Sequence, residues 1–166
     1  MIKPIQLPKE VVNALTPRIG DEHKAFYFYK AASNWCNEKG YFKAAKYFAN
    51  ESADELTHSE KLEKFIRDWN VIPELDTIEK PELEFKGLVD IIEQAYQMEY
   101  DLYEAYEQTS MTVFKIGDLC AFDLLQEFRT IQKDSVAEYS DFLNQLELID
   151  ANDKFQLFYF ENKHFK

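Results

Sequence analysis

The pair of residues best suited to chemistry in this chain is a carboxylate and an imidazole three positions apart, Glu55 and His58. On a helix this spacing places both side chains on one face, a single turn from each other. Counting from Phe48 in alternating steps of four and three residues gives a mostly apolar line that passes through Glu55. A carboxylate buried in such a line without a partner would cost several kcal/mol or take up a proton. The pattern therefore predicts a positive partner for Glu55, and a metal ion is the most direct candidate.

Three other predicted helices carry a polar interruption in an otherwise mostly apolar line. The interrupting residues are Glu22, Glu99 and Gln132. On the first hairpin, Glu22 lies 18 residues before Gly40 and Glu55 lies 15 residues after it; on the second, the two polar residues lie 17 and 16 residues from the turn. In antiparallel hairpins, equal offsets from a turn mean equal height along the bundle. We therefore expect three carboxylates, one imidazole and one amide to converge on a single layer.

The elements that must position this layer are four long helices, predicted at about 9–38, 41–69, 85–113 and 118–148, followed by a short C-terminal element at about 153–163. The segment 70–84 lacks helical periodicity and contains two prolines. Its fifteen residues can span ~50 Å when extended, whereas the preceding helix is ~40 Å long. The linker can therefore run the length of a bundle. We expect an all-α fold, a four-helix bundle with a long crossover between the second and third helices, forming a single domain over residues 1–166.

The composition excludes several classes of function. The net charge of −12 opposes binding to nucleic acid and to anionic membranes, and it favours cations as partners. No apolar run approaches the ~20 residues that span a bilayer, and the N-terminus lacks the apolar core of a signal peptide, so we expect a cytoplasmic protein. Cys36 and Cys120 are too far apart for a zinc knuckle or a redox pair. We expect both to be small core residues.

Each polar residue of the layer has an ordinary explanation when taken singly. A glutamate can extend to the bundle edge, a histidine can be a hydrogen-bonded core residue, and a glutamine can be a buried amide. Their convergence at one depth, with no lysine or arginine in the four lines there, favours a metal site. Oxygen-rich ligation with one imidazole suits iron or manganese better than the thiolate-rich sets typical of structural zinc.

Over nearly its whole length the chain resembles the non-haem bacterial ferritins. The matching elements, at similar mutual spacings, are Glu22 with Tyr29, the run Ser33-Asn34-Trp35-Cys36, the run Asp54-Glu55-Leu56-Thr57-His58, and Glu99 and Gln132. The resemblance implies a ferroxidase that oxidises Fe2+ with O2 or H2O2 and stores the ferric mineral in a homo-oligomeric shell of 24 subunits. It implies two iron ions per subunit and no haem.

The resemblance also implies roles for individual residues. Glu22, Glu55 and His58 would bind the first iron, with Glu55 bridging to the second. Glu99 would hold the second iron with Gln132 nearby. Tyr29 would lie close enough to hydrogen-bond a ligand or to donate an electron, although a core tyrosine with a satisfied hydroxyl is an equal alternative.

Departures from the family pattern narrow the choice of subfamily. Many bacterial ferritins carry a glutamate one turn after the glutamine, where this chain has Ser135, similar to the small residue of animal heavy-chain ferritins. Ser135 argues against a further iron site beside the pair, although Asp54 and Asp134 stay available as outer ligands. Bacterioferritins carry a second Glu-x-x-His on the last long helix and a methionine after the first glutamate, and this chain has neither. Rubrerythrins require a four-cysteine part that two cysteines cannot supply.

The C-terminal element is rich in aromatic residues between positions 155 and 160. A family member would use a short fifth helix here, packed at the fourfold axis of the shell; the alternative is a tail folded on its own bundle.

His23 lies off the apolar line, and we expect it on the surface. Two rival functions also stay open: a di-iron oxidase or oxygen or peroxide scavenger that forms no cage, and a non-catalytic subunit that only nucleates mineral.

Overall fold

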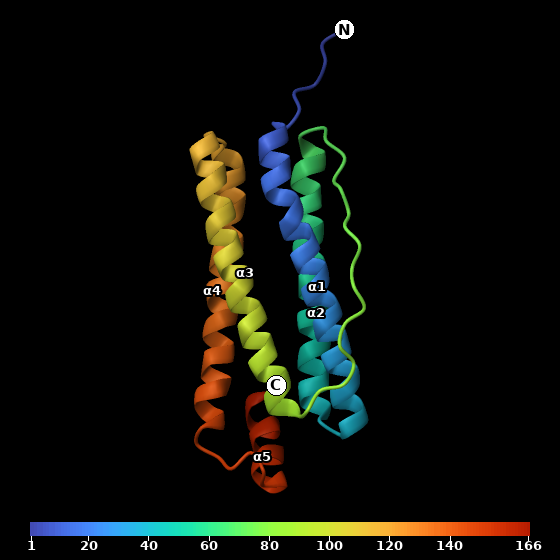
Figure 1. The fold of residues 1–166 in the computed structure, drawn as a ribbon, viewed down its shortest axis with the longest axis vertical. Helices are drawn as coiled ribbons and strands as arrows, with labels where there is room; N and C mark the ends of the chain where they lie inside the picture. The colour runs from blue at the N-terminus through green and yellow to red at the C-terminus, as the bar shows by residue number, and fades with distance from the viewer.

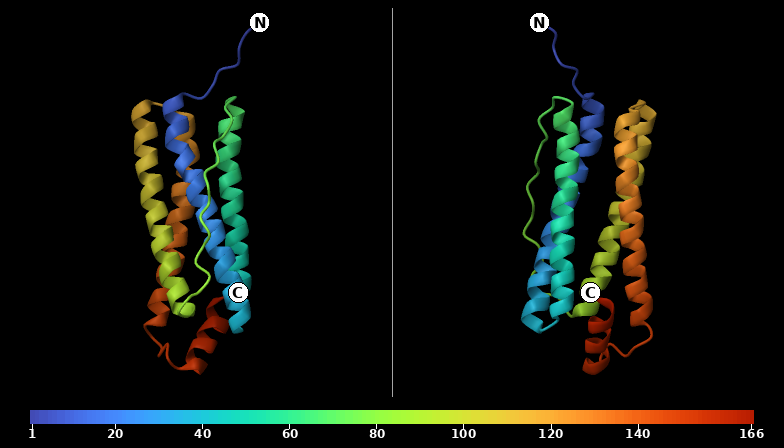
Figure 2. Two further views of the ribbon diagram at one scale, coloured as in Figure 1. Left: turned by 45° about the vertical axis from the view of Figure 1, so that its right-hand side comes forward. Right: turned by 180° about the vertical axis from the view of Figure 1, so that it is seen from behind.

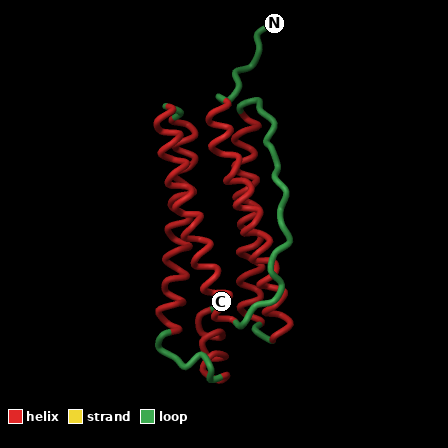
Figure 3. Tube along the Cα trace, in the orientation of Figure 1, coloured by secondary structure: helices red, strands yellow, loops and turns green.

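The computed structural model describes residues 1–166 as five α-helices without a β-strand (Figure 1). The helices are α1 (Lys9–Lys39), α2 (Phe42–Asp68), α3 (Leu88–Ile116), α4 (Leu119–Leu146) and α5 (Lys154–His164). The first four form an elongated bundle, and α5 lies at one end of it (Figure 3). The predicted all-α four-helix bundle with a short C-terminal fifth helix is confirmed, and the observed bounds differ from the expected ones by at most three residues.

The connection between α2 and α3 determines the direction of the helices. It runs along the outside of the bundle from one end to the other, as Figures 1 and 2 show. α1 and α2 therefore form one antiparallel hairpin and α3 and α4 form another, while α1 and α3 run in opposite directions. None of the helices combines the length and the apolar character needed to cross a membrane.

Glycine ends the first helix of each hairpin. Gly40 and Gly117 both adopt φ of 88°, a left-handed conformation that a residue with a Cβ rarely takes. In each case the glycine N–H donates back to carbonyls of the last helical turn. These two turns fix the register in which the facing helices meet, and thereby the height of the polar residues on them.

The core is divided into two apolar clusters by a layer of buried polar side chains. One cluster gathers around Tyr29, Phe48, Ile92 and Tyr139, and the other around Leu15, Leu62, Tyr106 and Phe128. Along every one of the four helices, the polar residue of the layer lies between the two groups. The two apolar clusters stabilise the bundle, so the layer between them can consist of polar side chains.

The C-terminal helix α5 packs partly on its own bundle. Phe160 and the following Phe165 are buried, and Phe165 stacks on Phe142 with a centroid separation of 4.9 Å. The outer side of α5 leaves three aromatic side chains exposed: Phe155, Phe158 and Tyr159. Phe160 therefore follows the alternative of a tail folded on its own bundle, because Phe142 at the end of the bundle offers it an apolar surface.

Two smaller expectations are also corrected. Cys36 is buried as predicted, but Cys120 is exposed, because it lies in the first turn of α4 on the side away from the core. His23 is half-buried rather than on the surface, and its Nε2 lies 3.7 Å from Oε1 of Glu63 on α2. The α1–α2 hairpin covers this histidine.

Candidate metal centre

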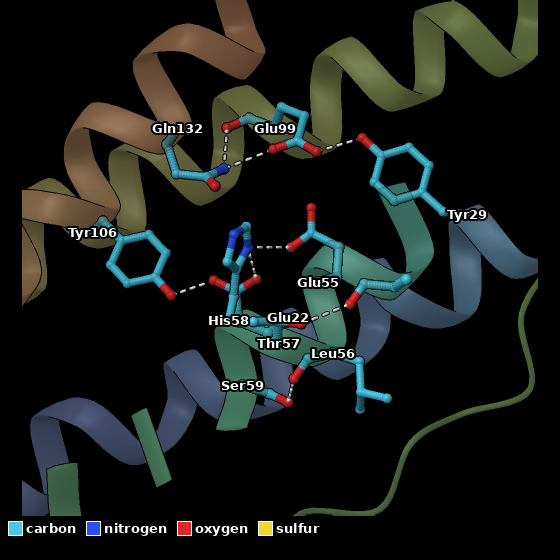
Figure 4. A network of polar contacts seen from close by, with 11 residues as sticks. Glu22, Tyr29, Glu55, Leu56, Thr57, His58, Ser59, Glu99, Tyr106 and Gln132 are labelled. Atoms are coloured by element: carbon cyan, nitrogen blue, oxygen red, sulfur yellow. Dashed lines mark hydrogen bonds and ion pairs between the residues drawn. The ribbon is translucent and has the colours of Figure 1, made fainter. Parts of the chain in front are cut away.

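The four interrupting residues meet in one layer, one from each helix. Glu22 of α1, Glu55 of α2, Glu99 of α3 and Gln132 of α4 are all almost completely buried, with at most 3% of each residue exposed. Their side chains point toward one another in the interior of the bundle (Figure 4). His58, one turn after Glu55, joins them from α2 and is half-buried.

Glu22, Glu55 and His58 form a compact group of potential ligands. Each offers one ligand atom, and these atoms all lie within 4.8 Å of one another. The Nδ1 atom of His58 lies 3.1 Å from Glu55 Oε2 and 3.6 Å from Glu22 Oε2. A single cation placed among them could contact all three with little rearrangement.

Glu99 and Gln132 form the other side of the layer. Gln132 Nε2 donates to Glu99 Oε2 at 2.7 Å, and the Tyr29 hydroxyl donates to Glu99 Oε1. Both oxygens of Glu99 are therefore engaged by protein donors. Tyr29 is a fully buried tyrosine next to the layer, and its hydroxyl is satisfied by Glu99.

Two buried oxygen atoms of the layer have no hydrogen-bond partner, Glu22 Oε2 and Gln132 Oε1. Both can only accept hydrogen bonds or bind a cation. Buried polar atoms are almost always satisfied in folded proteins, so each exception calls for an explanation. None of the three glutamates pairs with a lysine or an arginine, and the nearest cationic group is His58. The chemistry of the layer therefore fits a bound cation.

Burial and mutual repulsion set the protonation of the metal-free layer. Burial, together with the neighbouring Glu22, raises the pKa of Glu55 well above its usual range. Burial also raises the pKa of Glu99, against the hydrogen bonds from Tyr29 and Gln132. For Glu22, burial is outweighed by the neighbouring Glu55 and His58 and by the hydrogen bond from Tyr106, so its pKa is lowered. Burial opposes the charge of His58, but Glu22 outweighs it and raises the pKa of the imidazole. Without a cation, burial and mutual repulsion thus oppose the ionisation of Glu55 and Glu99.

Two residues next to the layer were not identified from the sequence. The Tyr106 hydroxyl donates to Glu22 Oε1, and its position seven residues after Glu99 repeats the seven-residue spacing of Glu22 and Tyr29. That repeated spacing was a signal that could have identified it. Glu51, one turn before Glu55 on α2, is half-buried, and burial and the charge of Glu138 raise its pKa to about 8.

The residues considered as outer ligands lie apart from the buried layer. Asp54 and Asp134 are exposed, and Ser135 is half-buried. The Asp134 carboxylate pairs with Lys133, at 2.8 Å, on the surface. No carboxylate therefore occupies the position one turn after Gln132, as the sequence indicates.

Comparison with protein families gives a match to the Ferritin-like domain over residues 12–149. Among curated relatives, a bacterial non-heme ferritin of Campylobacter jejuni is 27% identical over 143 residues, which cover 86% of this chain and 86% of the relative. A probable bacterial non-heme ferritin-like protein of Haemophilus influenzae is 26% identical over 148 residues, covering 89% of this chain and 90% of the relative.

Solved structures show the same arrangement of helices. An open pore ferritin from the archaeon Archaeoglobus fulgidus superimposes with a TM-score of 0.90 at 20% sequence identity, covering 96% of this chain and 98% of that one. A humanized archaeal ferritin superimposes with a TM-score of 0.90 at 21% identity, covering 96% and 97% of the two chains. At this level of identity the likeness establishes the fold.

Proposed function

The chain belongs to the ferritin family, and on that premise we propose that its buried polar layer is a di-iron centre that oxidises Fe2+ for storage as a ferric mineral. The observation that carries the proposal is the set of three buried glutamates without a lysine or arginine partner. Three carboxylates in a dry interior need compensating positive charge. Two ferrous ions, which are the substrate, would supply it.

The geometry supports a distinct role for each ligand. Glu22, Glu55 and His58 would bind the first Fe2+, because their ligand atoms already lie within 4.8 Å of one another. Glu55 has both Glu22 and Glu99 as neighbours, so it could bridge the two ions. Glu99 would bind the second Fe2+ after Gln132 releases its Oε2 atom, and Gln132 Oε1 is free to act as a neutral ligand.

The protonation of the glutamates would also change when a cation binds. Metal ligands must be deprotonated, and the raised pKa values of Glu55 and Glu99 oppose their ionisation when no cation is bound, so cation binding is coupled to proton release. Each Fe2+ gives up one electron when it is oxidised, so a pair of ions can reduce O2 to H2O2, or H2O2 to water. Tyr29 holds Glu99 in place through its hydrogen bond during these steps.

For storage we propose a homo-oligomeric shell of 24 copies. The exposed aromatic side chains Phe155, Phe158 and Tyr159 on one side of α5 support a contact between copies, since exposed apolar patches of this kind mark interaction surfaces. A closed symmetric assembly buries such a patch repeatedly. The alternative, an oxidase or oxygen or peroxide scavenger without a cage, would give a particle near the dimer mass that still oxidises Fe2+.

The proposal is tested by substituting ligands on α2. Glu55→Ala and His58→Ala should each slow aerobic Fe2+ oxidation at two ions per chain by at least ~100-fold, because each removes a ligand from the pair. Thr57→Ala is the matched control, since Thr57 lies between them but is exposed. Oxidation at the parent rate in both ligand variants would show that the centre lies elsewhere.

A further inference from the structure

Two buried tyrosines serve the metal centre in a reciprocal arrangement. Tyr29 of α1 donates to Glu99 of α3, and Tyr106 of α3 donates to Glu22 of α1 (Figure 4). In each helix the tyrosine follows the glutamate by seven residues, or two helical turns. Because α1 and α3 run in opposite directions, the two tyrosines lie on opposite sides of the layer, one in each apolar cluster, and each hydroxyl reaches back to the other helix's glutamate.

Both phenol groups are fixed by packing. Tyr106 and Tyr29 are fully buried. The Tyr106 ring stacks on Phe128 with a centroid separation of 5.0 Å and an interplanar angle of 11°, and the Tyr29 ring stacks on Phe48 at 6.0 Å and 15°. Each hydroxyl is therefore held in place to donate to its glutamate.

The two hydrogen bonds leave the two glutamates in different states. Glu22 accepts from Tyr106 through Oε1, while its Oε2 has no hydrogen-bond partner and lies on the side of His58. Glu99 accepts from Tyr29 through one oxygen and from Gln132 through the other, so neither is free. The first ligand group therefore presents an available oxygen, and the second does not.

We propose that Tyr106 is a positioning residue of the first cation site, the counterpart of Tyr29 at the second, and that its hydrogen bond holds Glu22 with one oxygen committed and the other free for a cation. This inference rests on the ligand assignment of the proposed function. Tyr106 acts through Glu22 and touches neither the ion nor the oxidant. Partners that orient a metal ligand in this way typically contribute a factor of 10 to 100 in affinity.

The experiment is a titration of the full-length, metal-free protein with Co2+ alone, followed by the ligand-field absorption of the bound ion. We expect Tyr106→Phe to weaken the first binding step about tenfold or more and to change the first Co2+ spectrum. Tyr29→Phe should leave the first step within about twofold and weaken the second. Both substitutions keep the stacked ring, and thermal unfolding of the metal-free variants checks that the fold is retained.

Tyr139→Phe is the matched control, because Tyr139 is equally buried but its hydroxyl has no hydrogen-bond partner. It should leave both binding steps unchanged, which separates the loss of a bond to a ligand from the loss of a buried hydroxyl. A first-step affinity in Tyr106→Phe equal to that of the parent overturns the role of Tyr106, provided that Glu22→Ala abolishes the step. If Glu22→Ala also binds the first Co2+ normally, the ligand assignment itself fails, and the inference fails with it.

Discussion

At the scale of single residues, the centre combines ligands of unequal strength. The first ion would meet Glu22, Glu55 and His58, while the second would share Glu55 and depend otherwise on Glu99 and the neutral Gln132. The second ion would also have to break the hydrogen bond between Gln132 and Glu99. Charge and geometry thus both predict that the second position would bind iron more weakly than the first.

Ser135 offers a test of this inequality. A glutamate there would add a carboxylate one turn after Gln132, so Ser135→Glu should tighten binding of the second ion about tenfold or more and slow the passage of iron through the centre. Anaerobic Fe2+ titration of the parent and the variant measures the two steps, with Asp134→Ala as a control for the surface charge. Two steps of equal affinity in the parent protein would refute the inequality.

Glu51 provides a second test, in the pH dependence of stability. Its pKa of about 8 lies above the unfolded value of 4.5, because burial and Glu138 oppose its charge. Between these pH values the folded chain binds more protons than the unfolded chain, so this group lowers stability as the pH rises. Glu51→Gln should therefore stabilise the metal-free protein by on the order of 1 kcal/mol at pH 8.5, and by much less at pH 5.

Urea unfolding of chelator-treated protein at the two pH values measures this difference. Asp54→Asn on the exposed side of α2 is the control for a change of net charge. An equal effect of Glu51→Gln at pH 5 and at pH 8.5 would contradict the raised pKa.

At the scale of elements, α5 completes the start of α2, the helix that carries Glu55 and His58. The residue before α2, Tyr41, provides no side-chain cap. Instead the buried Glu161 of α5 accepts from the backbone N–H groups of Lys43 and Ala44 at 2.7 and 2.9 Å. A carboxylate at a helix N-terminus also interacts favourably with the helix dipole. The C-terminal helix thus stabilises the helix at the centre of the site.

Glu161→Ala should lower the free energy of unfolding by about 1–3 kcal/mol, because it leaves two N–H groups of α2 without their acceptor. Glu161→Gln, which keeps an acceptor oxygen, should lose less. Thermal or urea unfolding of the metal-free chain gives both values. If alanine and glutamine at this position were both indistinguishable from the parent, the cap would contribute nothing.

The elements also show what sequence periodicity could and could not reveal. The apolar lines of α1 to α4 predicted the bundle, and their polar interruptions predicted the layer, because both repeat locally along one helix. The contact between Glu161 and Ala44 spans 117 positions and follows no local pattern. The expectation that Cys120 lies in the core was wrong because it rested on the residue type alone, and a single cysteine carries no periodicity. Tyr106 lay on a predicted apolar line, and only its partner on another helix distinguishes it from an ordinary core tyrosine.

At the scale of the whole molecule, α5 has one face that packs on its own bundle and one exposed face, which we propose forms a contact between copies. Its inner face buries Phe160 in the bundle, while its outer face exposes Phe155, Phe158 and Tyr159. Deleting residues 153–166 would disturb the folding of the bundle as well as any contact between copies. The deletion removes the buried Glu161 and Phe165 together with the exposed aromatic side chains. Substitution of the outer face alone is the sharper experiment.

Replacing Phe155, Phe158 and Tyr159 together by serine should lower the particle mass without changing the helix content, because none of these side chains is part of the core clusters. Light scattering after size-exclusion chromatography measures the mass. Exposed Phe114 lies in the last turn of α3, which ends at the opposite end of the bundle from α5, and it gives a control substitution, Phe114→Ser. A full-sized shell with unchanged thermal stability in the triple variant would remove α5 from the assembly.

The central claim is that iron binds in the polar layer between the two apolar clusters, and anomalous scattering from iron-soaked crystals tests it most directly. We predict two peaks inside each bundle, a stronger one among Glu22, Glu55 and His58 and a weaker one beside Glu99, with the stronger peak absent in His58→Ala. Iron found only on the surface of the bundle, with the buried layer empty at saturating iron, would contradict the account.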